Sequence, residues 1–445
     1  MRTRDSTIGS TMYRHTLLWF TNNLRLDDNP VFDQACNSER LTCLYIHHPR
    51  DKRTNRFGFK GIGQHRTQFL SQALSSLNDK LRPLNQALEV VESDYVDALS
   101  QVILRDQIEH LVTSRHTGSY EQNALKEIVS RFPHLVITVL ETHTLLHERQ
   151  LPFALSELPD SFTPFRKKVE QIKIDAPVPE PVSLPPRTEN GSSPLNIEYS
   201  TENRFNGSEQ SALKHLEDYF SSDLPATYKE TRNGLDAWEC STKFSPWLAL
   251  GVLSPKRIIA RLNRYEDEVV ANDSTYWIYF ELLWRDYFQW NAHKWGNKIF
   301  HQTGPFNRKP LTSFYPERMK SWIEGTTPYP IVNAAMRQLK ATGYQSNRAR
   351  QLVASCLVHE LGIDWRYGAA YFEEALIDFD LASNWGNWQY LGGVGADPRG
   401  HRQFNLAKQT QTYDPDGVFI KRWGGEEMML PIHRVDYHDW PIEMK

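Results

Sequence analysis

The chain has 445 residues, more than one ordinary hydrophobic core accommodates, so we expect two domains. Hydrophobic residues make up 40% and charged residues 24% of the sequence, and no apolar run approaches the roughly 20 residues of a membrane-spanning helix. A net charge of −3 gives no general attraction for nucleic acid, so DNA binding would need a local basic patch.

The first domain is predicted to be α/β and to span residues 13–145. Short apolar runs predict buried strands at Thr16–Phe20, Leu41–Ile46, Ala87–Val91, Ile108–Val112 and Leu135–Leu140. The stretches between them have helical spacing, at Pro30–Cys36, Gly63–Leu81, Asp94–Arg105 and Tyr120–Arg131. Strands that alternate with helices predict a doubly wound parallel sheet. Neither a GxGxxG turn nor a P-loop occurs, so this sheet does not indicate NAD or ATP binding.

Residues 146–205 are rich in Pro, Ser, Glu and Asn and predict a long interdomain connection over the surface. From 206 to 425 the periodicity is helical, most clearly at Gly207–Phe220, Ser254–Arg264, Ser274–Asn291, Pro330–Ala341, Ser346–Leu361 and Tyr367–Phe379. A short tail, 426–445, follows. Of the 13 tryptophans, all but Trp19 lie after residue 230. One Trp alone is usually a core residue, but so many in one helical domain suit a redox-active aromatic cofactor.

Three further features bear on ligands and location. The four cysteines, Cys36, Cys43, Cys240 and Cys356, form no CxxC pair, so we expect reduced thiols and no metal site. A basic stretch, Ile331–Glu360, is a candidate DNA-binding face, although a solvated helix face explains its charges equally well. Met1–His15 is polar and lacks a secretory signal, which predicts a cytoplasmic protein.

Several motifs occur in the order and at the spacing of a known family. They are Leu18–Phe20, Leu24–Pro30, Tyr228–Gly234, Ser241–Gly251, Glu281–Tyr287, Tyr329–Arg337, Ser346–Gln351, Asp364–Arg366 and Asp378–Tyr390. On these motifs the chain resembles the photolyase/cryptochrome family over residues 13–425, and within it the cryptochrome DASH branch. The resemblance implies an α/β N-terminal domain joined to an all-helical C-terminal domain that binds FAD.

The resemblance also assigns the FAD-binding residues. Those around the phosphates are Tyr228, Ser241, Thr242, Lys243, Phe244 and Ser245; those elsewhere in the site are Glu281, Arg285, Asn347, Arg350, Asp378, Asp380 and Asn384. Hydroxyls and backbone N–H groups at a helix start near Phe244 suit a phosphate, although an ordinary helix cap has the same composition. By resemblance, Arg350 and Asp378 form an ion pair beside the flavin ring, and Asp380 contacts the ring or ribose edge. Asn384 faces flavin N5, where plant and animal signalling members typically have Asp or Cys.

A second set of residues is implied for electron transfer. Trp388 and Trp365 match the two inner members of the family's tryptophan triad, through which photoexcited flavin draws an electron. Thr312 occupies the position of the outer member, which is a departure from the family. Phe314, Tyr315 and Trp322 lie nearby in the sequence, and Tyr315 is a candidate substitute for it.

A third set is implied for binding a flipped-out cyclobutane pyrimidine dimer. It comprises Glu281, Trp284, Asn347, Gln351 and Tyr390. An extruded base needs a partner for its Watson–Crick edge and an aromatic platform, which Glu281 and Trp284 supply. Gln351 and Tyr390 stand where photolyases of duplex DNA often have Met and Trp. The pocket is thus more polar, and we expect a preference for single-stranded DNA, where unpairing costs little.

The antenna and the biological role stay open at this point. Family members that bind 5,10-methenyltetrahydrofolate usually present a Glu where this chain has His116, so specific support for folate is lost. The first interpretation is a light-driven dimer photolyase. The second is a blue-light signalling photoreceptor with little or no repair activity, although only a short segment follows Trp423. A metabolic α/β enzyme with a helical cap explains none of the ordered motifs.

Overall fold

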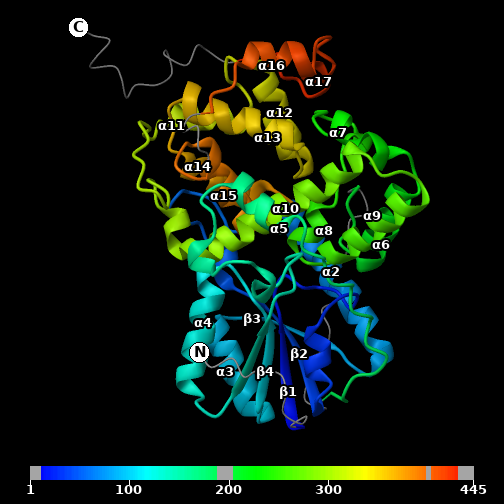
Figure 1. Cartoon of the computed structure of the whole chain (residues 1–445). Helices are drawn as coiled ribbons and strands as arrows, with labels where there is room; N and C mark the ends of the chain where they lie inside the picture. The colour runs from blue at the N-terminus through cyan, green and yellow to red at the C-terminus, as the bar shows by residue number, and fades with distance from the viewer. Residues whose placement is uncertain (1–11, 188–203, 397–401, 429–445) are drawn as a thin grey trace.

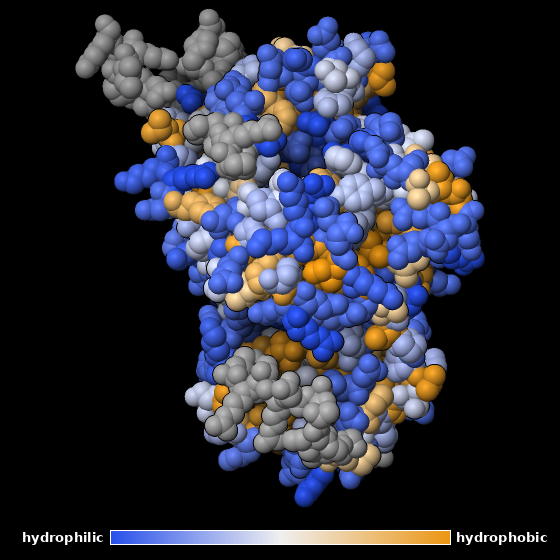
Figure 2. All heavy atoms as spheres, viewed as in Figure 1, coloured by the Kyte–Doolittle hydropathy of each residue, from blue (hydrophilic) through white to orange (hydrophobic). Residues whose placement is uncertain are grey.

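The computed structural model describes residues 12–187, 204–396 and 402–428. A sheet with flanking helices forms one half of the molecule and a helical assembly forms the other (Figure 1). In the described residues, no helix is both long and apolar enough to span a bilayer. In the view of Figure 2, hydrophilic side chains predominate over both halves, and apolar ones gather in small groups near the middle.

Five strands form one parallel sheet in the order β3-β2-β1-β4-β5. They are β1 (Tyr13–Phe20), β2 (Ser38–His47), β3 (Leu88–Glu92), β4 (His110–Ser114) and β5 (Val136–Leu140). The intervening helices are α1 (Val31–Ala35), α2 (Gln64–Leu81), α3 (Tyr95–Asp106) and α4 (Ser119–Arg131). The predicted doubly wound sheet is thereby confirmed. Apolar runs identified the strands because both faces of a parallel sheet are covered.

The side chains on the two faces of the sheet belong to different hydrophobic cores. Leu17 and Trp19 of β1 pack with apolar residues of α3 and α4 in a core confined to the sheet domain. Leu18 and Phe20, which point the other way, belong to a larger core that continues into the helical domain. The two halves of the molecule therefore share buried apolar surface.

Residues 146–187, part of the expected surface connection, pack against both halves. They include α5 (Phe162–Val169), whose Phe162, Phe165 and Val169 are buried in the larger core. Further along, the chain returns to the sheet domain, where Asp28 N donates to Val178 O at 3.1 Å and Val178 N donates to Asp28 Oδ1 at 2.9 Å. The rest of the connection, 188–203, lies outside the described residues.

The second half is built from helices. They are α6 (Glu209–Phe220), α7 (Tyr228–Thr231), α8 (Ser245–Ala249), α9 (Pro255–Glu268), α10 (Asp273–Trp295), α11 (Pro316–Glu324), α12 (Pro330–Thr342), α13 (Asn347–Ser355), a π-helical turn (Cys356–Glu360), α14 (Trp365–Ala375), α15 (Leu381–Leu391), α16 (Leu406–Tyr413) and α17 (Val418–Arg422). The six predicted helices are all present. The one predicted to reach Phe379 ends at Ala375, and Leu376 is extended. This early end leaves Asp378 and Asp380 on a non-helical segment before α15.

Buried charged side chains join the two halves. Arg25 is 1% exposed, and its guanidinium donates to four backbone carbonyls, including Thr142 O at 3.0 Å and Gly251 O at 2.8 Å. Glu209 of α6 accepts from Leu26 N and Asp27 N at 3.1 and 2.9 Å. Buried charges are tolerated only where they are bonded in this way, so these contacts fix the helical half relative to the sheet.

Buried imidazoles predict a loss of stability in mild acid. Burial lowers the pKa of His110 in β4 to about 4 and that of His293 in α10 to about 3. An unfolded histidine titrates near pH 6.5, so between that pH and about 4 the unfolded state binds more protons. For His110 alone we expect the free energy of unfolding to fall by roughly 3 kcal/mol over this window. Urea denaturation at several pH values measures this fall in the free energy of unfolding. Replacing His110→Gln should make the decline shallower, and an unchanged slope would contradict this assignment.

Candidate flavin and substrate site

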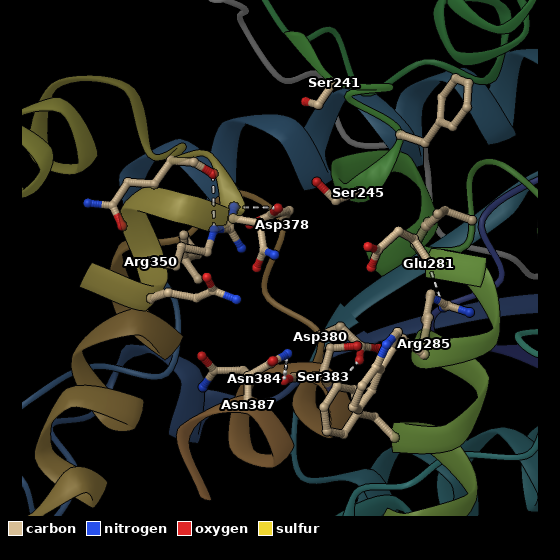
Figure 3. A pocket seen from close by; sticks show the side chains of 18 of the residues that line it. Ser241, Ser245, Glu281, Arg285, Arg350, Asp378, Asp380, Ser383, Asn384 and Asn387 are labelled. Atoms are coloured by element: carbon tan, nitrogen blue, oxygen red, sulfur yellow. Dashed lines mark hydrogen bonds and ion pairs between the residues drawn. The ribbon is translucent and has the colours of Figure 1, made fainter. Parts of the chain in front are cut away.

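A cavity of about 410 Å³ lies within the helical half, between α8 and α10 on one side and α13, α15 and the segment 376–380 on the other (Figure 3). Its walls include the residues expected to bind a cofactor: Tyr228, Ser241, Thr242, Lys243, Phe244, Ser245, Glu281, Arg285, Asn347, Arg350, Asp378, Asp380 and Asn384. Trp284, Gln351, Trp388 and Tyr390 also line it. Trp365 and Tyr315 are not among the lining residues. The structure therefore brings together side chains separated by more than half of the helical domain's length.

The segment Ser241–Ser245 turns sharply into α8. Lys243 adopts a left-handed conformation (φ 56°), and α8 starts at Ser245, one residue after the position expected from the sequence. A ring nitrogen of His215 lies 2.8 Å from Thr242 O, which fixes the turn from outside the cavity. The hydroxyls of Ser241 and Ser245 are drawn at the same end of the cavity in Figure 3. Such hydroxyls and the neighbouring N–H groups are suited to phosphate oxygens.

Arg350 and Asp378 form the ion pair that the sequence predicts. Arg350 Nη2 lies 2.7 Å from Asp378 Oδ2, and the Asp378 side chain is 1% exposed. Burial alone would lower the pKa of Arg350, but the Asp378 carboxylate holds it above its usual range. Arg350 Nε also donates to Gln345 O at 3.0 Å, so the guanidinium is held in one orientation. A fixed positive charge at this wall favours a bound anion or a ring that gains negative charge.

Two buried oxygens at this wall are acceptors without a hydrogen-bond partner among the residues that the structure describes. They are Asp378 Oδ1 and Gln345 Oε1, both on residues that line the cavity. A buried acceptor left without a donor is costly, and polar ligand groups commonly fill this role. The N–H and O–H groups of FAD are donors of this kind, so the residues present fit the cofactor. Gln345 was not identified from the sequence, although it directly precedes the motif Ser346–Gln351.

The bottom of the cavity in Figure 3 is formed by the start of α15. Asp380 caps this helix by accepting from Ser383 N at 2.7 Å, and it also accepts from Gln289 Nε2 of α10 at 2.8 Å. Asn384, 8% exposed, uses its amide Nδ2 to donate to Ala369 O at 3.0 Å. Its Oδ1 is therefore the amide atom left to accept from a ligand N–H.

Glu281, on the α10 wall, has a charged partner that the sequence analysis missed. Arg232 Nη1 forms an ion pair with Glu281 Oε1, and Trp277 Nε1 donates to the same oxygen at 3.2 Å. The Glu281 side chain is 30% exposed. Burial raises the pKa of Glu281, and Arg232 opposes that rise. Arg232 lies in the family-like motif Tyr228–Gly234, so its position in the sequence was a usable signal.

The aromatic surface that Trp284 and Tyr390 offer for stacking is smaller than the sequence suggests. The Trp284 ring stacks on Phe162 of α5, with centroids 3.8 Å apart and planes at 13°. The Tyr390 ring lies edge-on to Trp284 at 6.0 Å, and the Arg402 guanidinium lies 4.5 Å from the Tyr390 centroid. One face of Trp284 is thus covered by the protein itself. Asn347 and Gln351 line the cavity from α13.

The expected electron-transfer residues lie on different elements. Trp388 of α15 lines the cavity and is 2% exposed. Trp365 is fully buried and lies edge-on to Trp385, with centroids 5.7 Å apart. The segment that carries Thr312 and Tyr315 runs beside residues 362–364, since Asp364 N donates to Ser313 O at 2.8 Å. It therefore passes close to the start of α14, where Trp365 lies.

Gly368 of α14 makes room for the Trp388 ring. A Cβ at Gly368 would lie 2.2 Å from Trp388 Cη2. We expect Gly368→Ala to lower the free energy of unfolding by about 1–3 kcal/mol, because the ring must move within a packed interior. Chemical denaturation measures the change. In the Trp388→Phe background, which lacks Cη2, the same Gly368→Ala change should cost less, although the added Cβ would still lie 2.5 Å from Leu357 Cδ2. An equal cost in both backgrounds would show that the Trp388 ring is not the source of the destabilisation.

His116, the residue at the expected antenna position, is bonded within the protein. Its Nδ1 lies 3.3 Å from Glu121 Oε2, and Glu121 Oε1 is 3.0 Å from both Arg50 Nη2 and Tyr95 Oη. Burial would raise the pKa of Glu121, but His116 and Arg50 hold it well below its usual range. His116 Nδ1 also accepts from Gly118 N at 2.9 Å, so the imidazole that was considered for a pterin is held within the protein, close to the Glu121 carboxylate. In residues 12–187, 204–396 and 402–428, no cluster of His, Cys, Asp and Glu could hold a metal ion.

Comparison with known proteins defines the class to which this fold and cavity belong. Residues 277–444 match the family model described as the FAD binding domain of DNA photolyase, and residues 16–183 match the model described as DNA photolyase. The chain belongs to the photolyase/cryptochrome family.

Its relatives indicate the branch. The chain is 49% identical to cryptochrome DASH of Idiomarina loihiensis, with 97% of each chain covered. It is 51% identical to that of Vibrio parahaemolyticus, with 96% of this chain and 97% of the relative covered. A Synechocystis cryptochrome structure superposes with a TM-score of 0.87 at 37% identity, over 96% of this chain and 91% of that chain. A class III photolyase structure from Agrobacterium tumefaciens gives 0.78 at 25% identity, over 94% and 88%. This is a flavoprotein of the DASH type, with FAD as its cofactor.

Proposed function

We propose that this chain repairs cyclobutane pyrimidine dimers in DNA, preferentially in single strands, using light absorbed by reduced FAD. The observation that carries the proposal is the composition of one cavity. It combines a buried cation–carboxylate pair, Arg350 and Asp378, with a second carboxylate, Glu281, and an aromatic wall at Trp284. The first pair suits the flavin, and the second pair suits an extruded base.

When bound, reduced FAD supplies a light-driven electron that opens the cyclobutane ring and then returns, so the reaction has no net redox change. Arg350 would hold a fixed positive charge near the flavin, whose reduced ring carries negative charge. The amide Oδ1 of Asn384 would be available to accept from a ring N–H without adding charge. Asp378 holds the guanidinium in place and keeps the site electrically balanced.

The dimer is held by residues on the opposite side of the same cavity. Glu281 bonds the Watson–Crick edge of the flipped base, and Arg232 fixes the orientation of its carboxyl. Trp284 offers one ring face, because Phe162 covers the other. Tyr390 lies edge-on to Trp284 and so gives a smaller stacking wall than two parallel rings. This limited platform gains less energy from an extruded dimer, which supports the preference for single strands.

A comparison of two substrates tests the proposal. Protein with fully reduced FAD is mixed with a dimer-containing oligonucleotide, either single-stranded or annealed, and repair is followed under blue light. We expect rapid repair of the single strand and little repair of the duplex, because unstacking and unpairing cost a few kcal/mol. Equal rates on both would contradict the preference. Repair of neither would favour the signalling photoreceptor.

The site gives less support to a second, light-harvesting chromophore. A folate antenna would have to contact His116 while its Nδ1 accepts from Gly118 N and lies 3.3 Å from Glu121 Oε2. The proposed reaction does not require an antenna, since the flavin itself absorbs blue and near-ultraviolet light.

A further inference from the structure

A continuous series of aromatic rings leaves the cavity at Trp388 and crosses three helices. Trp388 of α15 lies edge-on to Trp322 of α11, with centroids 6.2 Å apart and planes at 72°. Trp322 lies edge-on to Tyr371 of α14, with centroids 5.6 Å apart and planes at 70°. Tyr371 in turn contacts Phe59, at 5.4 Å. Rings at these separations are in direct contact, which is the condition for short electron-transfer steps.

The rings become more exposed along the series. Trp322 is fully buried, with Nε1 donating to Val353 O at 2.9 Å, whereas Tyr371 is 9% exposed and Phe59 is partly buried. An electron taken from Trp322 can therefore be replaced only through a neighbouring ring. Tyr371 is the first residue of the series with exposed surface and an oxidisable phenol.

The local charges also distinguish Tyr371 from Tyr315. The Arg318 guanidinium carbon lies 4.1 Å from the Tyr315 centroid, and a cation so close to a ring opposes the loss of an electron from it. Beside Tyr371 the nearby charge is negative: burial and the Glu374 carboxylate raise the pKa of the Tyr371 phenol to about 12. An anion stabilises a ring from which an electron has been withdrawn.

The series through Trp365 leads to another buried ring. Its aromatic neighbour is Trp385, which is 4% exposed and whose Nε1 donates to Glu373 Oε2 at 3.3 Å. Trp385 contacts Phe300 at 4.9 Å, and phenylalanine is much harder to oxidise than tyrosine or tryptophan. Thr312, at the position of the family's outer Trp, offers no oxidisable ring.

We propose that Trp322 and Tyr371 form an electron-transfer route to the flavin, with Tyr371 as the terminal donor. The route requires FAD in the cavity but not the proposed repair of DNA, so it goes beyond the proposed function. Trp388 gives one electron to the light-excited oxidised flavin and regains one from Trp322, which regains one from Tyr371. Tyr371 loses that electron together with its phenolic proton, which passes to water, and a neutral tyrosyl radical remains. An added thiol returns one electron and one proton to Tyr371, and two of the resulting thiyl radicals combine to a disulfide.

A matched pair of Tyr→Phe variants tests the route. The FAD-loaded full chain is illuminated with blue light in the presence of a thiol, and flavin reduction is followed by absorbance. Tyr371→Phe should slow the reduction by about tenfold, and Tyr315→Phe should leave its rate unchanged. Transient absorption after a light pulse should show a tyrosyl radical in the wild type that is lost in Tyr371→Phe. Trp322→Phe should slow the reduction as much as Tyr371→Phe does.

Two readouts separate this route from the proposed function. FAD content and dimer repair by dithionite-reduced protein should be the same in Tyr371→Phe and wild type, since neither needs the route. Unchanged photoreduction in Tyr371→Phe with a loss in Tyr315→Phe would overturn the inference and leave the proposed function standing. Absence of repair by the reduced wild type would overturn the proposed function and leave the route standing.

Discussion

Replacing Asp378→Asn is expected to remove most of the bound FAD from an otherwise folded protein. The substitution keeps the shape of the side chain but leaves the buried Arg350 guanidinium without its anion. The substitution also replaces the buried carboxylate acceptor Asp378 Oδ1 by a neutral amide, so a donor group of FAD loses a charge-assisted hydrogen bond. Such bonds contribute about 1.5–3 kcal/mol, and we therefore expect the affinity for FAD to fall by about 10- to 100-fold. Fluorescence titration of the apoprotein with FAD measures the change.

An exposed ion pair supplies the control for this experiment. Lys214 and Asp218 face solvent on α6, with side chains 73% and 62% exposed, so Asp218→Asn makes the same chemical change outside the cavity. Exposed pairs contribute at most about 1 kcal/mol, and this variant should bind FAD like the wild type. Circular dichroism of both variants checks that they are folded. Retention of FAD by a folded Asp378→Asn protein would refute the role given to the ion pair.

The second large effect is expected at the pair of Glu281 and Arg232. Glu281→Gln should lower the rate of dimer repair by about 10- to 100-fold, because it removes the charge of the group that we propose bonds the flipped base. Arg232→Met should lower it as well, since the carboxyl loses the group that orients it. In the double variant the losses should be less than additive, because both single variants break one interaction. The rates of repair by the wild type, the two single variants and the double variant, all with fully reduced FAD, give this double-mutant cycle.

The pH profile tests whether Arg232 acts through Glu281. Burial raises the pKa of Glu281, while Arg232 opposes the rise. Removal of Arg232 takes away the lowering contribution, so the pKa of Glu281 should move further upward. Whichever protonation state supports repair, the inflection of the pH–rate profile should shift to higher pH in Arg232→Met. An inflection that does not move would mean that Arg232 contributes to repair by a different contact.

Much of the fold could be predicted because the sequence patterns that specify its strands and helices are local. The run Leu17–Phe20 is buried on both faces of the sheet, and only a covered parallel strand accommodates such a sequence. The lining of the cavity was predicted because the residues fall in motifs of ordered spacing. Their convergence at one place follows from the family fold that the motifs identified.

The features that escaped prediction depend on contacts between distant segments. Phe162 lies in a stretch with a loop-like composition, yet α5 forms there because its apolar face has the Trp284 ring to pack against. Arg232 precedes Glu281 by 49 residues, and their ion pair requires α7 to lie beside α10. The contact between Trp322 and Tyr371 likewise joins two helices whose relative position no periodicity encodes.

Light absorbed by reduced FAD in this cavity is proposed to split pyrimidine dimers. The action spectrum of repair, taken with dithionite-reduced protein and a dimer-containing single strand, tests this proposal. We expect the repair rate to follow the absorption spectrum of the bound reduced flavin and to fall to zero in the dark. Repair in darkness, or none at any wavelength by protein with a full complement of reduced FAD, would contradict it.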